Sequence, residues 1–307
     1  MVGSSSGRYV NDKELIHDKD MFIENYKQMN GSLMIYACPH RQDEPYANVL
    51  LPVDFELGGN YASESNFKKV FLSCHFITKD TSSADLFFLP FSIARLHYDP
   101  QVGIDGIQDF IRDYIFNISH EYPYGNCSGG ADHFYVACHS IGRSTMEKAF
   151  EVELNAIQIV CSSSYYIASY VAHKDASSKL VFFAGSITLS VREKLLQVWE
   201  NDSKISVNSG HLLTSSSDEL LRSKFCLHVK GFKVNTARIG NALYYGCFFS
   251  YCRHIRYPSS EENPPRISHK EYLILQSNVL KVREHFQWHL SLVDYDAFYM
   301  VMYELWL

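Results

Sequence analysis

Short apolar runs alternate along the chain with segments in which apolar residues recur every three or four positions. The apolar runs predict strands, at residues 33–37, 85–91, 134–138, 157–161, 180–184 and 225–229. The amphipathic segments predict helices, at residues 64–75, 106–118, 191–199, 237–245 and 270–286. Because strands that alternate with helices usually form parallel sheets, the pattern predicts an α/β protein.

The most informative stretch joins a strand, a glycine turn and a helix. The apolar run 225–229 precedes Gly231, and the helical spacing begins at Ala237, with Arg238 in its first turn and Gly246 placed to end the helix. Free N–H groups at a helix start attract an anion, and a guanidinium can donate two parallel hydrogen bonds to it. The stretch therefore predicts a phosphate site, with an ordinary strand–loop–helix unit as the alternative.

A second, similar arrangement lies earlier in the chain. Gly185 follows the run 180–184, and Arg192 stands at the start of the next predicted helix. Glycine would let the backbone approach a phosphate, and an arginine would neutralise charge on a departing nucleotide. An ordinary turn and a surface ion pair are the structural alternatives.

Three residues are candidates for a general base. Asp132 and His133 form an acidic–imidazole pair, and His139 follows shortly after. Imidazole titrates near neutral pH, and a neighbouring carboxylate could orient it for proton transfer. The alternative for Asp132 and His133 is a structural pair at a strand end.

Composition narrows the class of protein. The 307 residues fit two domains, and 46% hydrophobic residues suffice for two cores. A formal net charge of −6 argues against a nucleic-acid-binding surface. Eight cysteines include no Cys-x-x-Cys pair, so zinc-ribbon and thioredoxin motifs are unsupported, and Cys226 in mid-strand is expected to be a buried free thiol.

No metal site is expected. Asp294 and Asp296 have the Asp-x-Asp spacing of some metal sites, but they precede a predicted aromatic helix, where carboxylates favour the helix start. His254, His269, His285 and His289 are interpreted as solvated.

The stretch at residues 223–247 resembles the donor-sugar region of the exostosin-like glycosyltransferases, glycosyltransferase family 47, which build plant cell-wall polysaccharides. The shared features are the strand Ser223–Leu227, Gly231, Arg238 and the pair Gly246-Cys247. Further blocks similar to the family follow in order, at residues 61–64, 84–92, 129–134, 182–185, 295–298 and 305–307. The resemblance runs from about residue 30 to the last residue.

The resemblance implies a GT-B-like fold, in which two Rossmann-like domains face a cleft. Residues 1–30 would be a flexible stem remnant, residues 31–175 the acceptor-side domain, and residues 176–307 the nucleotide-sugar-side domain with its final helix packing back. It also implies inverting transfer from a nucleoside diphosphate sugar, such as a UDP-sugar, to a cell-wall polysaccharide or glycoprotein, without a further cofactor. Family members are Golgi proteins with an N-terminal membrane anchor, which this sequence does not show.

The chain departs from the family pattern at three places. Asn241 replaces an acidic residue that is thought to hold the ribose, the stretch before Phe182 is short, and a different sequence follows Cys247 where the family has a core strand. These departures predict weak donor binding and little or no transfer. A catalytically degenerate partner or relic, alone or in an oligomer, is therefore the alternative to an active enzyme.

A carbohydrate-binding module is a further alternative. Tyr122, Tyr124 and Trp199 could stack on sugar rings. In a chain with 14% aromatic residues such side chains more often belong to a core, and a two-domain layout favours an enzyme.

Overall fold

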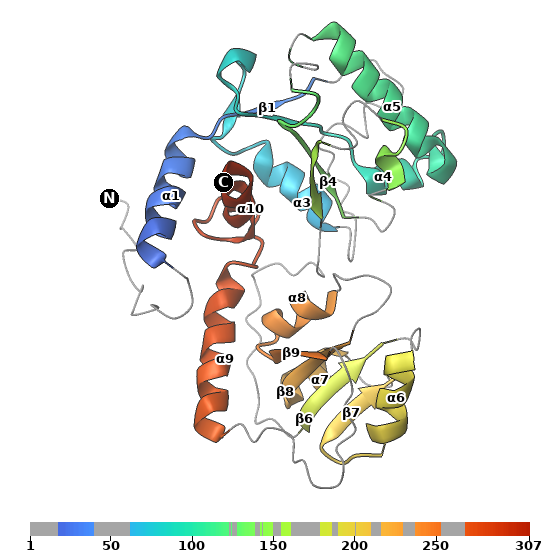
Figure 1. Ribbon diagram of the computed structural model, residues 1–307, viewed down its shortest axis with the longest axis vertical. Helices are drawn as coiled ribbons and strands as arrows, with labels where there is room; N and C mark the ends of the chain where they lie inside the picture. Colours follow the sequence, from blue (N-terminus) through green and yellow to red (C-terminus); the bar gives the residue numbers. More distant parts are fainter. Residues whose placement is uncertain are drawn as a thin grey trace.

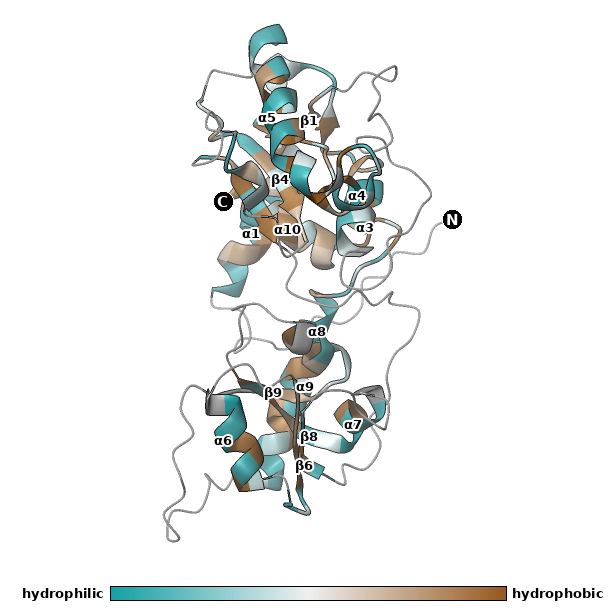
Figure 2. Ribbon diagram, turned by 90° about the vertical axis from the view of Figure 1, so that its right-hand side faces the viewer, coloured by the Kyte–Doolittle hydropathy of each residue, from teal (hydrophilic) through white to brown (hydrophobic). Residues whose placement is uncertain are grey.

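The computed structural model places the chain in two parts, each built on its own β-sheet (Figure 1). Figure 2 shows the same two parts after a quarter turn. The structure describes residues 18–39, 62–122, 124, 128–138, 142, 144–149, 155–160, 179–185, 190–199, 201–209, 216–229, 237–252 and 268–307. Parallel strands joined through helices confirm the predicted α/β class.

The first sheet has the strand order β2-β1-β3-β4-β5, and all neighbouring strands in it are parallel. Its strands are β1 (Ile35–Ala37), β2 (Ile77–Thr78), β3 (Leu86–Phe88), β4 (His133–Ala137) and β5 (Ile157–Val160). Every residue of β3 and β4 is buried. A parallel sheet covered on both faces requires such continuous burial.

Helices cover both faces of this sheet. They are α1 (Lys19–Ser32), α3 (Ala62–Phe71), α4 (Ile93–Tyr98), α5 (Gly103–Glu121) and α10 (Ala297–Trp306), with 3-10 turns η2 (Thr81–Ser83) and η4 (Ser144–Met146). Phe87 and Tyr135 pack on the side of α4 and α5, whereas Phe88 and Phe134 pack on the side of α1, α3 and α10. This alternation follows from the two-residue period of a strand.

Helix α1 corrects the interpretation of residues 1–30 as a flexible stem, from Lys19 onward. Met29 is fully buried, and the ring of Tyr26 stacks on that of Tyr295 with 4.1 Å between centroids. The partners of α1 come from the far end of the chain, where α10 lies beside it (Figure 1). A local polar pattern could not reveal these contacts.

The second sheet has the order β7-β6-β8-β9, again with parallel neighbours. Its strands are β6 (Lys179–Ala184), β7 (Ile205–Asn208), β8 (Ser223–Val229) and β9 (Phe248–Cys252). Its helices are α6 (Ser190–Trp199), α7 (Ser216–Arg222), α8 (Ala237–Tyr244) and α9 (His269–Glu284). Strand β6 pairs with β8, with Val181 opposite Phe225 and Phe182 opposite Cys226.

Strand β9 corrects the expectation that a core strand is lost after Cys247. All five of its residues pair in parallel with β8, from Phe248 opposite Phe225 to Cys252 opposite Val229. Aromatic residues favour extended backbone, so a different sequence fills the same position in the sheet. The second sheet therefore has a strand beside β8, as the family pattern requires.

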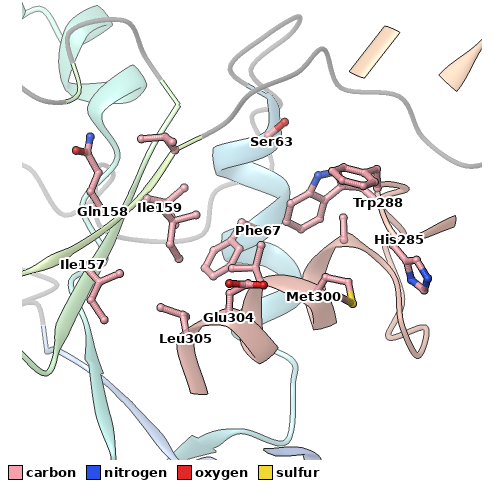
Figure 3. A pocket seen from close by; sticks show the side chains of 15 residues that line it. Ser63, Phe67, Ile157, Gln158, Ile159, His285, Trp288, Met300, Glu304 and Leu305 are labelled. Atoms are coloured by element: carbon pink, nitrogen blue, oxygen red, sulfur yellow. The ribbon is translucent and has the colours of Figure 1, made fainter. Parts of the chain in front are cut away.

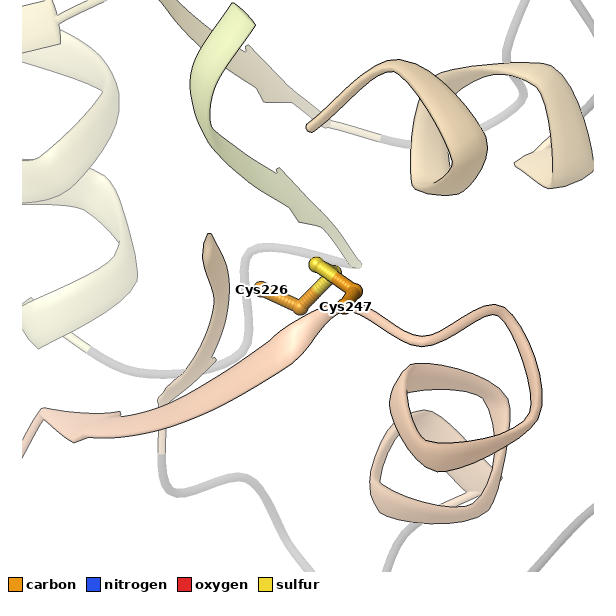
Figure 4. Close-up of a disulfide and its surroundings, with 2 residues drawn as sticks. All are labelled: Cys226 and Cys247. Carbon is orange, nitrogen blue, oxygen red and sulfur yellow. A yellow bond between two sulfur atoms is a disulfide. The ribbon is translucent and has the colours of Figure 1, made fainter. Parts of the chain in front are cut away.

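A disulfide joins Cys226 of β8 to Cys247, the residue before β9 (Figure 4). This corrects the expectation of a free thiol at Cys226. The two cysteines are 21 residues apart in the sequence, and only the pairing of β8 with β9 brings their Cα atoms to 5.7 Å. Cys38 and Cys74 are free and buried.

Candidate functional site

In open parallel α/β sheets, ligands bind at the carboxyl ends of the strands. In the second sheet this edge includes Gly185 after β6 and Val229 at the end of β8. The N–H of Gly185 donates to the carbonyl of Asn208 at 3.1 Å, which extends the pairing of β6 with β7 by one residue. The predicted site residue Gly185 thus lies on the edge where a ligand is expected.

The predicted strand and the predicted helix are confirmed as β8 and α8, and residues 230–236 between them lie outside the described residues. Gly246 has a φ of +62°, in the left-handed region that favours glycine, and it ends the helix as the sequence indicated. Arg238 lies in the first turn of α8, and the half-buried Asn241 follows about one turn later. Gly231 and the side chain of Arg238 lie outside the described residues.

The structure places Arg192 in the interior, and its role in holding a diphosphate stays a prediction. Its side chain is only 3% exposed, its Nη2 donates to the carbonyl of Val229 at 3.1 Å, and its guanidinium lies 5.7 Å from the ring centre of Phe183. Burial also lowers the pKa of Arg192. In this position Arg192 connects α6 to the last residue of β8.

Asp132 and His133 lie at the amino end of β4, on the edge opposite to the carboxyl ends. The Nδ1 of His133 is 2.7 Å from Oδ1 of Asp132, which also accepts from the hydroxyl of Ser128. His133 is 2% exposed, stacks on Phe87, and has its pKa lowered by burial. These contacts match the structural alternative, so a catalytic role for the pair stays a prediction; His139 lies outside the described residues.

The carboxyl edge of the first sheet carries charged residues that sequence reasoning missed. Glu64, in the first turn of α3, is buried among Ser92, Ala94 and Cys138. Burial raises the pKa of Glu64, despite the hydrogen bonds from these residues. The sequence block that ends in Glu64 was the available signal, but no pattern showed which strands it would reach.

Lys68 lies one turn after Glu64 on α3. Its Nζ donates to the carbonyl of Pro90 at 2.8 Å, and the side chain is largely buried. Burial and the nearby charge of Arg95 lower the pKa of Lys68 to about 7, and Glu64 opposes this shift. A group with so shifted a pKa at the carboxyl edge is a typical feature of a functional site.

A pocket of about 470 Å³ opens between β5, α3 and α10. Figure 3 shows Ile159 of β5 on one side and Trp288 on the other, with Phe67 between them and Leu305 at the lower edge. Most of the described lining side chains are apolar, and none of these is a lysine or arginine. The described lining therefore offers neither of the side chains that most often bind a diphosphate.

The C-terminal aspartates have structural roles. Oδ1 of Asp296 accepts from the N–H groups of Phe298 and Tyr299 and caps α10, and Asp294 accepts from the hydroxyl of Tyr26 at 3.2 Å. The described residues contain no group of three or more His, Cys, Asp or Glu side chains that could hold a metal ion.

The histidines near these aspartates are not simply solvated, which corrects the sequence interpretation. Nδ1 of His289 lies 3.1 Å from Oδ2 of Asp296, and Nδ1 of His285 lies 2.8 Å from the carbonyl of Tyr295. Both side chains fix the turn before α10.

The aromatic residues considered for sugar binding belong to cores. Tyr124 is buried and stacks on Phe87, Tyr122 packs against the same cluster, and Trp199 packs beside Phe183 and Leu195. The carbohydrate-binding alternative loses its main support.

The family model described as the exostosin GT47 domain matches residues 29–179 and 176–251. The chain belongs to the exostosin GT47 family. The matched segments thus include both described sheets up to residue 251, whereas most of α1 and all of α9 and α10 lie outside them. Across the part of the chain that the structure describes, no helix is long and apolar enough to cross a membrane.

Three relatives from Arabidopsis thaliana agree with the GT47 assignment. Probable glycosyltransferase At5g03795 is 29% identical to this chain, and the aligned region covers 93% of this chain and 64% of the relative. For Probable glycosyltransferase At5g25310 the identity is 25%, and the aligned region covers 96% of this chain and 71% of the relative. For Probable glycosyltransferase At3g07620 the identity is 28%, and the aligned region covers 75% of this chain and 59% of the relative. The chain thus spans about two thirds of the length of these relatives.

Proposed function

We propose that this chain is an inverting glycosyltransferase that uses a UDP-sugar donor and a plant cell-wall polysaccharide or glycoprotein acceptor. The observation that carries the proposal is the β8–α8 unit, with the start of α8 at the carboxyl edge of a parallel sheet. The GT47 family and the names of the relatives support it. In the proposed GT-B arrangement, residues 31–175 and 176–307 form two Rossmann-like domains that face a cleft.

The proposed donor site uses the carboxyl edge of the second sheet. The N-terminus of α8 and the guanidinium of Arg238 would hold the diphosphate, and Gly185 and Gly231 would let the backbone approach it. Asn241 would accept a hydrogen bond from the ribose. Arg192 would act on the donor through Val229, because its guanidinium binds that carbonyl.

The proposed transfer step is a displacement at the anomeric carbon. The acceptor oxygen forms the new bond as the bond to the diphosphate breaks, a base takes the hydroxyl proton, and the leaving UDP carries the negative charge. Of the three base candidates, His139 follows Cys138, which lies at the carboxyl end of β4, whereas Asp132 and His133 lie at the amino end. We therefore favour His139 as the base.

The disulfide between Cys226 and Cys247 supports a secretory location. Disulfides persist in oxidising compartments and are rare in the cytosol. We include the Golgi lumen in the proposal on this ground and on the family resemblance.

Substitution of Arg238 by alanine is expected to weaken UDP binding about 10- to 150-fold, because one charge-assisted contact to the diphosphate is lost. Isothermal calorimetry with UDP measures this change. Arg222→Ala, which removes an exposed arginine at the end of α7, is the matched control and should bind UDP like the parent protein. Equal affinity of Arg238→Ala and the parent would exclude Arg238 from the donor site.

Substitution of Asn241 by aspartate is expected to strengthen UDP binding about tenfold, because a carboxylate accepts ribose hydroxyl bonds more strongly than an amide. Calorimetry again provides the measurement, and Asn241→Ala should change affinity in the opposite direction. If aspartate leaves the affinity unchanged, Asn241 does not contact the ribose.

The alternative hypothesis, a catalytically degenerate protein, has lost one of the observations that supported it. That observation was a missing strand after Cys247, and β9 occupies this position. Asn241 and the short stretch before Phe182 are the remaining departures. UDP binding without any sugar transfer would favour the alternative.

A further inference from the structure

The buried carboxylate of Glu64 connects two strands at the carboxyl edge of the first sheet. Its Oε1 accepts from the hydroxyl of Ser92 and from the N–H of Ala94 at 3.4 Å, and its Oε2 accepts from the N–H of Cys138 at 3.2 Å. Ser92 and Ala94 belong to the segment that leaves β3, and Cys138 is the first residue after β4. One side chain of α3 thereby fixes the exits of two neighbouring strands.

Lys68 adds a second attachment to the same segment. Its Nζ donates to the carbonyl of Pro90 at 2.8 Å, between the end of β3 and Ser92. Glu64 and Lys68 are four residues apart, so they lie on the same face of α3. The helix therefore holds the exit of β3 at two points and the exit of β4 at one.

Stability alone does not account for this arrangement. Glu64 is 4% exposed, and the desolvation of a carboxylate is costly enough that an apolar residue of similar volume often stabilises a core as well or better. What an apolar residue cannot do is bind a hydroxyl and two N–H groups from separate segments at once. The contacts of Glu64 therefore serve to orient the chain where the two strands end.

We propose that Glu64 is a positioning residue for sugar transfer, which fixes the segments leaving β3 and β4 as the acceptor-side wall of the active site. This inference rests on the proposed function. Glu64 is 4% exposed and all three of its described donors are protein groups, so in this proposal it acts through the backbone of Cys138 and of the Ser92–Ala94 segment.

The test compares Glu64→Gln in the full chain with the parent protein. Glutamine has nearly the same shape as glutamate, but the NH2 group of its amide is a donor and cannot accept the hydrogen bonds that a carboxylate oxygen accepts. The kcat for transfer to a cell-wall polysaccharide extract, with the best of a panel of UDP-hexoses and UDP-pentoses, should fall about tenfold to a hundredfold, as expected for a small misplacement of reacting groups. The Kd for UDP should stay within about twofold, because the donor site lies on the other sheet.

The matched control is Glu193→Gln, which changes an exposed glutamate in the first turn of α6. It should leave both quantities unchanged. Unchanged kcat in folded Glu64→Gln, or a parallel loss of UDP affinity, would overturn the inference. If Glu64→Gln melts below the assay temperature, Ser92→Ala decides, because it removes one donor only: a fall in kcat at normal UDP affinity supports the inference, and parental kcat refutes it.

Amide hydrogen exchange separates this inference from the proposed function. Exchange at the N–H of Cys138 and Ala94 should be faster in Glu64→Gln than in the parent, while exchange in β8 stays the same. An inactive parent protein would refute the proposed function, and the exchange data would still decide whether Glu64 fixes these segments. Equal exchange in both proteins would show that it does not.

Discussion

Replacement of Glu64 by alanine is expected to lower the free energy of unfolding by about 3–5 kcal/mol, the usual cost of breaking a buried charged network by removing one partner. The change leaves the hydroxyl of Ser92 and the N–H groups of Ala94 and Cys138 without their acceptor. It also leaves the buried ammonium of Lys68 without the carboxylate that favours its charged form.

Urea unfolding monitored by circular dichroism measures this loss. Glu193→Ala provides the control, because this glutamate is exposed in the first turn of α6 and its removal should cost less than about 0.5 kcal/mol. A loss below about 1 kcal/mol for Glu64→Ala would mean that water or neighbouring groups replace the carboxylate. The network would then contribute little to the stability of the first sheet.

Removal of the Cys226–Cys247 disulfide is expected to lower the free energy of unfolding by about 3 kcal/mol, because the cross-link closes a loop of 21 residues and restricts the unfolded chain. The double variant Cys226→Ala/Cys247→Ala tests this value. Its effect should concentrate in the second sheet, because the bond joins β8 to the start of β9.

The control for the disulfide is Cys38→Ala/Cys74→Ala, which removes two buried thiols that form no cross-link. The double variant of the disulfide should be less stable than this control by roughly 3 kcal/mol. Dithiothreitol should destabilise the parent protein more than the Cys226→Ala/Cys247→Ala variant, which keeps the disulfide of Cys138. Equal stability of the two double variants would contradict a stabilising role for the bond.

The elements with strong local patterns were predictable from sequence. The run 225–229 and the amphipathic helix from Ala237 appear as β8 and α8, and Gly246 ends the helix as expected. A strand buried on both faces has a continuous apolar run, and an amphipathic helix has apolar residues with a 3.6-residue period. Both patterns can be recognised within a short window of sequence. The family resemblance came from the same local blocks.

The features that the sequence analysis did not predict share one physical cause, which is contact between residues that are distant in the sequence. Helix α1 depends on Tyr295 and α10, and β9 exists because it pairs with β8 although its sequence differs from the family pattern. Cys226 and Cys247 become neighbours only through that pairing. None of these partners lies within a window of sequence that a local pattern could join.

The sequence by itself determined the α/β class, the family and the residue types of the donor segment, because these depend on local periodicity and on short motifs. Only the tertiary structure decided which edge of a sheet each candidate occupies. It placed His133 at the amino end of β4, turned Arg192 toward the carbonyl of Val229, and brought Glu64 to the exits of β3 and β4. Strand direction and order set these positions, and both result from pairing and packing across the whole chain.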